Sequence, residues 1–115
     1  MTATETIETV RLAKEALENK KGIDIVVLDV RKTSSVTDYY LIASGSSAPH
    51  IKALAEEVEV NLKKSGQHPY RKSGTPDSEW MATDYVDTVV HIFSPESRDY
   101  YALEKLWNDA PQVTV

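Results

Sequence analysis

Apolar side chains recur at every third or fourth position in the first twenty residues of the chain. This spacing places them on one stripe of an α-helix. A glycine at position 22 marks the end of such a helix, so we expect it to span roughly residues 4 to 20. The residues of the stripe are Ile7, Val10, Ala13 and Leu17.

A second helix is predicted between Ser47 and Gly66, where the apolar stripe is the clearest in the chain. Ser47 has the side chain of an N-cap, Pro49 falls in the first turn where its missing N–H does little harm, and Gly66 is typical of the residue after a helix end. The stripe consists of Ile51, Leu54, Ala55, Val58 and Leu62.

Shorter apolar segments predict five strands. The segment "IDIVVLDV" at 23–30 is nearly continuous in its apolar content, which is typical of a strand covered on both faces. Further strands are expected at 38–44, within "HPYRKSG" followed by a turn, in "EWMATD" and in "DTVVHIF". The residues "DYVD" at 84–87 are predicted to form the hairpin turn between the last two strands.

A last helix is predicted from Ser94 as N-cap and Pro95 as its first residue, with an apolar face of Tyr100, Leu103 and Trp107, ending within 108–111. The predicted order is therefore α-β-β-α-β-β-β-α. A strand-helix-strand unit among hairpins indicates an α/β (α+β) fold, with a mixed five-stranded sheet and helices packed on it. The length of 115 residues suits a single domain spanning 1–115.

Composition narrows the classes of partner. The net charge is -5, from 13 Lys+Arg and 18 Asp+Glu. This charge suits a basic protein partner better than a phosphate backbone, so we expect no direct DNA binding. The chain has no cysteine, which excludes disulfides and a thiol nucleophile. Its apolar runs are too short for a membrane span and it shows no signal or transit peptide, so a cytoplasmic protein without membrane contact is expected.

Candidate catalytic chemistry is sparse. The three histidines are scattered, so we expect neither a metal nor another cofactor, and no serine lies in a nucleophile elbow. His91 alternates with Val90 and Ile92, so it shares a sheet face with Val89 and Phe93. A half-buried, hydrogen-bonded histidine is the favoured interpretation.

One enzymatic alternative stays open. The turn "ASGSS" at 43–47 leads from a strand into a helix N-terminus, where backbone N–H groups favour an anion. A nucleotidyltransferase-like phosphate-handling enzyme uses such a turn, together with paired carboxylates that hold two metal ions. Asp84 and Asp87 instead fall at a turn, so the fold is compatible with that class while the catalytic pair is missing.

The aromatic side chains of the stretch 78–93 suit binding by contact. Trp80, Tyr85 and Phe93 are able to stack on bases, but carboxylates surround them, which argues against nucleic acid. Tyr and Trp also dominate protein-binding hot spots. Two interpretations remain for Trp80 and Tyr85: a protein-binding surface, or side chains that cover the rim of the core.

Four motifs in order resemble the Iojap, or ribosomal silencing factor (RsfS), family. They are "DIVVLDV", "SSVTDYYLIASG", the block "W…DYVD-VVHIF" and "YYALEKLWNDAP", and the match covers roughly Gly22 to Pro111. The resemblance implies a nucleotidyltransferase-like fold without the catalytic carboxylates, and no enzymatic activity. It implies binding to the large ribosomal subunit through ribosomal protein L-fourteen, a block of association with the small subunit, and repression of translation when nutrients are limiting. Homodimers also occur in the family.

The resemblance also implies a partner-binding surface and shows where this chain departs from the family. The surface is centred on Trp80, Met81, Asp84, Tyr85 and Asp87, with Ser44, Gly45 and Glu79 as neighbours. The family usually has glycine where this chain has Val86, so we expect a turn that keeps φ negative or is longer. Further departures are Glu79 before the tryptophan, and Pro49 and His50 at the start of the second helix.

Overall fold

The computed structural model describes residues 3–32, 37–102 and 110–115. Within them the predicted order of elements is confirmed. The helices are α1 (Ala3–Asn19), α2 (Ala48–Lys63) and α3 (Pro95–Tyr101), and a 3-10 turn, η1, spans Pro76–Ser78. The strands are β1 (Ile23–Asp29), β2 (Tyr39–Ser44), β3 (Arg71–Thr75), β4 (Trp80–Asp84) and β5 (Thr88–Phe93).

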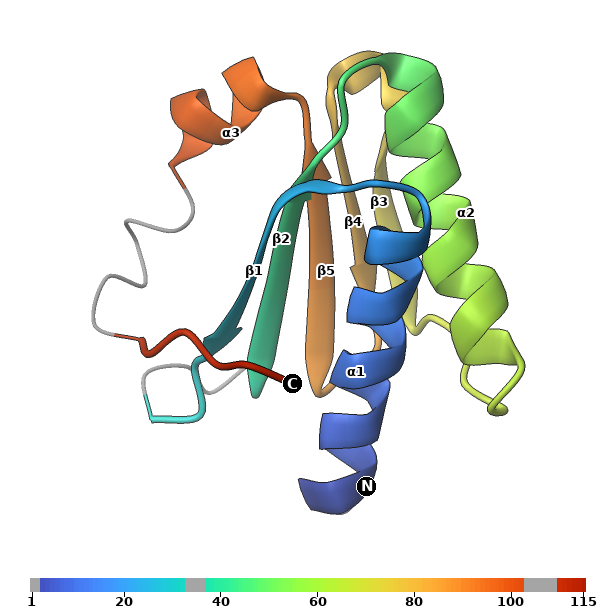
Figure 1. The fold of residues 1–115 in the computed structure, drawn as a ribbon, viewed down its shortest axis with the longest axis vertical. Helices are drawn as coiled ribbons and strands as arrows, with labels where there is room; N and C mark the ends of the chain where they lie inside the picture. The colour runs from blue at the N-terminus through green and yellow to red at the C-terminus, as the bar shows by residue number, and fades with distance from the viewer. Residues whose placement is uncertain (1–2, 33–36, 103–109) are drawn as a thin grey trace.

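The strands form one mixed sheet in the order β1-β2-β5-β4-β3 (Figure 1). The two central strands, β2 and β5, are parallel, because the chain crosses over through α2 between them, and every other pair is antiparallel. Five of the six residues in each central strand are buried, as expected of parallel strands covered on both faces.

Helices α1 and α2 pack side by side on one face of the sheet, here called the helix face (Figure 1). Their predicted apolar stripes meet alternate residues of the central strands, such as Leu41 and Ile92, and form the main core. The opposite face, here called the second face, carries a smaller buried cluster. Its fully or nearly fully buried members are Leu28, Val30, Ile42 and Phe93.

The last residues of the chain cover the outer edge of β1. Asp29 N–H donates to the Pro111 carbonyl and Val113 N–H to the Val27 carbonyl, each at 2.9 Å. Lys14 Nζ donates to the Val115 carbonyl at 3.3 Å, so the tail also reaches α1. An edge strand with unpaired backbone groups invites foreign pairing, and the tail satisfies two of these groups on β1. The sequence pattern did not indicate this role.

The third strand differs from the prediction in its bounds. It was expected within residues 68–74, followed by a turn, whereas it spans Arg71–Thr75 and the turn that follows is η1. Gly74 has φ 81°, and a Cβ there would lie 2.1 Å from the Trp80 carbonyl oxygen. The glycine therefore serves close approach between β3 and β4, rather than a chain reversal.

The last helix is shorter than predicted. Ser94 is its N-cap and Pro95 its first residue, as expected, but it ends at Tyr101 because Ala102 adopts a left-handed conformation with φ 49°. The chain must then return to the edge of β1. Tyr100 is 82% exposed instead of lying on an apolar face. The predicted partners Leu103 and Trp107, and the expected helix stop beginning at residue 108, lie outside the described residues.

The hairpin turn between β4 and β5 also corrects an expectation. Val86 has φ 75°, although a turn with negative φ, or a longer turn, was expected for a β-branched residue. The Tyr85 carbonyl accepts from Asp87 N–H at 3.0 Å across Val86, the pattern of a γ-turn, whose form with positive φ is strained. The Asp84 carboxylate holds this geometry by accepting from Val86 N–H at 2.7 Å.

Replacing Val86 with glycine is expected to raise the free energy of unfolding by about 1 kcal/mol. Positive φ costs an L-residue roughly 1–2 kcal/mol, and the greater entropy of unfolded glycine offsets part of the gain. Urea unfolding measures the change. The control is Val86→Ala, which keeps a Cβ at positive φ and should gain little; an equal gain from both variants would assign the effect to the exposed side chain instead of the backbone.

Candidate protein-binding surface

Three rows of paired residues cross the second face at its centre. The register places Tyr40, Val89, Asp84 and Arg71 in one row, Ile42, His91 and Ala82 in the next, and Ser44, Phe93, Trp80 and Thr75 in the third. Because side chains alternate along a strand, all of these belong to the same face. The prediction that His91 shares a face with Val89 and Phe93 is confirmed.

Four ring side chains gather on this face and form what we call the aromatic cluster: Tyr40, Trp80, His91 and Phe93. The Trp80 ring stacks on Phe93 with centroids 5.7 Å apart and planes 11° apart, and His91 lies 6.0 Å from each of them. Tyr40 meets His91 at 5.4 Å in a tilted arrangement. Offset stacking of this kind stabilises the cluster beyond the area that it buries.

A hydrogen bond inside the cluster connects Trp80 to His91. The indole Nε1–H donates to His91 Nδ1 at 3.1 Å, so the imidazole must be neutral, with its proton on Nε2. His91 is 8% exposed, and burial lowers its pKa to about 4 while the Asp84 carboxylate acts in the opposite, raising direction. The expected hydrogen bond of the histidine is confirmed, but His91 is buried, whereas a half-buried side chain was expected.

The five residues expected at the centre of a partner surface do not share one face. Trp80 and Asp84 lie on the second face, whereas Met81 packs against the main core under the helices. Tyr85 is only 5% exposed and belongs to that same core. The alternation of side chains along β4 separates Met81 from Trp80, so a continuous Trp80–Tyr85 patch, as the sequence suggested, is not what the fold presents.

Tyr85 is a core residue with an unusual hydroxyl. Among the described residues the buried phenol oxygen has no hydrogen-bond partner. Burial, together with the Glu59 carboxylate, raises the pKa of Tyr85 well above its ordinary value, so the phenol stays neutral. Tyr85 is therefore buried more deeply than a side chain that only covers the rim of the core.

The two aspartates of the turn accept hydrogen bonds from backbone N–H groups. Asp84 accepts from Val86 N–H and lies 3.7 Å from the Arg71 guanidinium, with a side chain that is 20% exposed. The backbone carbonyl of Asp87 accepts from the N–H groups of Asp38 and Tyr39, at 3.0 and 3.1 Å. These bonds join the hairpin turn to the start of β2.

The three residues expected to neighbour the surface differ in their exposure. Glu79 is exposed, ends η1 with φ 64° and stands directly before Trp80. Ser44 is buried, and its hydroxyl accepts from Arg98 Nη1 at 3.1 Å. Gly45 is a packing glycine, since a Cβ there would lie 2.8 Å from Ile51 Cγ1. Of the three, Glu79 is the one that presents its side chain to solvent.

The turn before α2 uses its own side chains where a phosphate would bind. Ser46 N–H donates to His50 Nδ1 at 2.8 Å, and His50 N–H donates to Ser47 Oγ at 3.2 Å, which confirms Ser47 as N-cap. The other imidazole nitrogen of His50 donates to the Lys20 carbonyl at 2.8 Å. The backbone N–H groups of Ser46 and His50 at the helix start therefore already have acceptors within the chain. No observation favours the phosphate-handling alternative.

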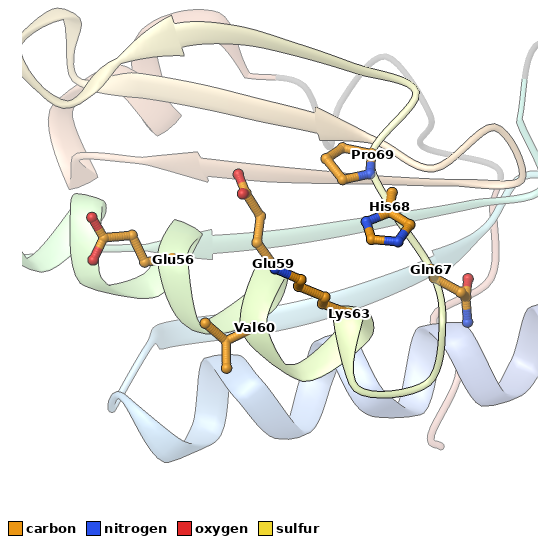
Figure 2. A pocket seen from close by; sticks show the side chains of 7 residues that line it. All are labelled: Glu56, Glu59, Val60, Lys63, Gln67, His68 and Pro69. Carbon is orange, nitrogen blue, oxygen red and sulfur yellow. The ribbon is translucent and has the colours of Figure 1, made fainter.

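A groove of about 430 Å³ lies on the outer side of α2 (Figure 2). Residues of α2 line one side, and the segment that leads to β3 lines the other. Glu59 in this groove already pairs with Lys72, at 3.3 Å. No group of three His, Asp or Glu in the described part of the chain is arranged to hold a metal ion. The lining residues are Glu56, Glu59, Val60, Lys63, Gln67, His68 and Pro69.

Sequence reasoning missed the residues that hold Trp80. His91 and Phe93 were placed on one face, and parity within each strand was the signal available for Tyr40 and Trp80. Parity alone did not show that Trp80 and Tyr40 would lie against His91 and Phe93. Only the register, which pairs Trp80 with Phe93 and Ala82 with His91, brings the rings together.

No helix among the described residues is long and apolar enough to cross a membrane.

Acidification should destabilise the fold through His91. The pKa of His91 is about 4 in the folded chain, whereas its ordinary value is 6.5. Between these pH values the unfolded chain therefore binds more protons than the folded chain. The free energy of unfolding therefore rises with pH across this window. The contribution of His91 is complete above pH 6.5 and is lost as the pH falls toward 4, by roughly 2–3 kcal/mol at pH 4.5.

The measurement compares denaturant unfolding at pH 7 and pH 4.5. His91→Asn is the matched control, because its amide oxygen can accept the indole N–H and does not titrate. The wild-type chain should lose more stability than the variant over this interval. Equal losses would show that the pH dependence comes from other groups.

Removing the Tyr85 hydroxyl should leave stability unchanged or raise it by up to about 1 kcal/mol, because a buried hydroxyl without a partner contributes no hydrogen bond. Tyr85→Phe is the test, measured by thermal and denaturant unfolding. Tyr85→Ala serves as its counterpart and should cost about 3–5 kcal/mol through the cavity it leaves. A large loss in Tyr85→Phe would reveal a hydroxyl partner.

Comparison with known proteins assigns the family. Residues 3–115 match the family model described as "Ribosomal silencing factor during starvation". The ribosomal silencing factor RsfS of Chromobacterium violaceum is 43% identical over 100 residues, which cover 87% of this chain and 82% of that protein. The mouse protein named mitochondrial assembly of ribosomal large subunit protein 1 is 35% identical over 94 residues, which cover 79% of this chain and 41% of that protein.

A crystal structure of a protein from Chromobacterium violaceum superposes with a TM-score of 0.85 at 42% identity, covering 88% of this chain and 84% of the other. The mixed sheet with helices on the helix face is therefore shared with solved relatives. Since the family model spans nearly the whole chain and the identities extend over most of it, the chain belongs to the ribosomal silencing factor (RsfS) family.

Proposed function

We propose that this chain binds the large ribosomal subunit through ribosomal protein L-fourteen, prevents association with the small subunit, and represses translation under nutrient limitation. The action is steric and involves no catalysis. The setting that fits this role is the cytoplasm. Family membership supports the ribosomal setting, and the mouse relative carries the large subunit in its name.

The observation that carries the proposal is the placement of Trp80. It is a half-buried tryptophan on the second face, held by stacking and by the hydrogen bond to His91. Tryptophan is one of the residue types in which protein-binding hot spots are enriched. The exposed Glu79 beside it provides a carboxylate for a basic partner.

Within this proposal the expected contact residues take two roles. Trp80 and Glu79 meet the partner, and Asp84 and Asp87 shape the end of the same hairpin. Met81 and Tyr85 support the hairpin from the helix face, where they anchor it to the main core. A homodimer, as the family resemblance implies, would compete with the ribosomal partner if it used the same face.

Trp80→Ala should weaken binding to isolated large subunits by about 30-fold or more, which corresponds to the ~2 kcal/mol of a hot spot. Co-sedimentation at increasing protein concentration measures the affinity. The same variant should lose the ability to prevent intact ribosomes from forming when separated subunits are mixed. Circular dichroism must first show that the variant is folded.

Val60→Ala is the matched control. Val60 is 48% exposed in the groove on α2 and so lies away from the second face (Figure 2). It should bind large subunits like the wild-type chain. A folded Trp80→Ala variant with unchanged affinity would remove Trp80 from the contact, and wild-type protein that fails to co-sediment would overturn the proposed function.

A further inference from the structure

The ten residues 63–72, here called the basic segment, reverse the charge of the chain locally. Their sequence is "KKSGQHPYRK", with four Lys and Arg residues and no Asp or Glu, in a chain whose net charge is -5. The segment runs from the last residue of α2 through a loop into β3. A charge reversal confined to one part of the surface indicates a partner of opposite sign at that part.

The cations of the basic segment are only partly compensated by carboxylates of the chain. The ion pairs of this region are Lys52–Glu56 at 3.9 Å, Lys72–Glu59 at 3.3 Å and Arg71–Asp84 at 3.7 Å. Lys63 and Lys64 are both exposed, and neither forms an ion pair with a described residue. Their two ammonium groups, at the end of α2, are therefore available to the oxygens of a phosphate.

Tyr70 adds an exposed ring to the same segment. The residue is 73% exposed, although its backbone is fixed, because its N–H donates to the Asp84 carbonyl at 2.7 Å. Single-stranded nucleic acid is bound by this combination of groups, since bases stack on an aromatic ring while phosphates pair with nearby cations.

Hydrogen bonds hold the loop of the basic segment in one shape. Gln67 N–H donates to the Leu62 carbonyl at 3.0 Å, and the Gln67 side chain is hydrogen-bonded at 2.7 Å to the buried Thr9 hydroxyl of α1. Lys63 and His68 line the same groove, one from α2 and the other from the loop (Figure 2). A loop fixed in this way presents its side chains without first having to order the backbone, which favours binding.

We propose that the basic segment binds RNA, with Lys63 and Lys64 on phosphates and the Tyr70 ring stacked on a base. This inference rests on the proposed function for its setting: on the large ribosomal subunit, the RNA is that of the subunit itself. An acidic protein would also satisfy the cations, but the exposed ring beside them matches a base next to its phosphates.

The basic segment lies away from the surface around Trp80. The register pairs Arg71 with Asp84 at one end of the β3–β4 hairpin and Thr75 with Trp80 at the other. A basic protein at Trp80 and RNA at the basic segment are therefore compatible in one complex. Because the two contacts share no residue, loss of one should leave the other in place.

The first test measures binding of the full chain to a fluorescein-labelled single-stranded RNA of about twelve nucleotides, by polarisation at several salt concentrations. Replacing Lys63 and Lys64 together by Gln should lower the affinity on the order of tenfold at about 0.1 M salt. The slope of log affinity against log salt should fall by about 1.4, since each phosphate contact on a single strand contributes about 0.7. Lys63→Arg with Lys64→Arg keeps both charges and should bind like the wild-type chain.

Lys20→Gln with Lys21→Gln is the matched control, because it removes two exposed lysine charges at the other end of α2. The Lys20 carbonyl meets the His50 ring, near the start of α2, at 2.8 Å. The 16 residues of α2 are roughly 24 Å long, well beyond the screening length of about 10 Å at 0.1 M salt. The control should therefore bind within about twofold of the wild-type chain. Val60→Ala, which changes neither a charge nor a ring, should also leave RNA binding unaltered.

The ring of Tyr70 is tested separately. Tyr70→Ala should lower the affinity for the labelled RNA about fivefold or more through the lost stacking, whereas Tyr70→Phe keeps the ring and should bind within about twofold of the wild-type chain. An equal loss in both variants would assign the effect to the hydroxyl group and overturn the stacking contact.

Co-sedimentation with large subunits places the inference in its setting. Lys63→Gln with Lys64→Gln should weaken this binding about threefold to tenfold relative to the wild-type chain and to the Lys20 and Lys21 control. Ultraviolet irradiation of the complex should join the wild-type chain covalently to RNA of the subunit.

The outcomes distinguish this inference from the function on which it rests. A wild-type chain that binds large subunits, but neither binds the labelled RNA nor cross-links to RNA, would overturn the inference alone; a loss caused by the Lys63 and Lys64 change would then indicate an acidic protein as partner. Equal losses in this variant and in the Lys20 and Lys21 control would also overturn it. Absence of wild-type binding to large subunits would overturn the proposed function and, with it, the assignment of the RNA to the ribosome.

Discussion

The parallel pairing of β2 and β5 at the centre of the sheet is the constraint on which the rest of the structure depends. Two neighbouring strands that are apolar on both sides must be covered on both faces. Helices α1 and α2 cover the helix face with their apolar stripes. On the second face, a smaller cluster of side chains is buried, and the stacked rings of Trp80 and Phe93 belong to it.

The covering of both faces of the central strands explains the state of the histidine on β5. At 8% exposure a charged imidazole would be costly, and burial keeps His91 neutral. The neutral ring offers one acceptor, and the Trp80 indole satisfies it. One hydrogen bond thus removes the cost of a buried polar atom and fixes an aromatic ring at the rim of the surface. Stability and the geometry proposed for partner binding therefore depend on the same contact.

Local backbone constraints complete the hairpin that carries Trp80. Gly74 allows β3 to approach the Trp80 carbonyl, and Val86 occupies a positive φ that suits glycine better. The Asp84 carboxylate compensates by holding the turn, and the Asp87 carbonyl joins it to β2. Close backbone contacts at both ends thus define the hairpin. Its acidic residues contribute to its shape through the hydrogen bonds that they accept.

The sequence by itself determined the elements, their order and the mixed sheet, because apolar periodicity, N-caps and prolines act over a few residues. It also placed His91 and Phe93 on one face by parity within β5. Only the tertiary structure decided which residues of different strands meet, because register depends on contacts that are distant in sequence. That register sent Met81 and Tyr85 to the helix face and joined Trp80 to His91. The pairing of the C-terminal tail with β1, the early end of α3 and the strained Val86 were likewise decided by the closing of the whole fold, which overrode local preference.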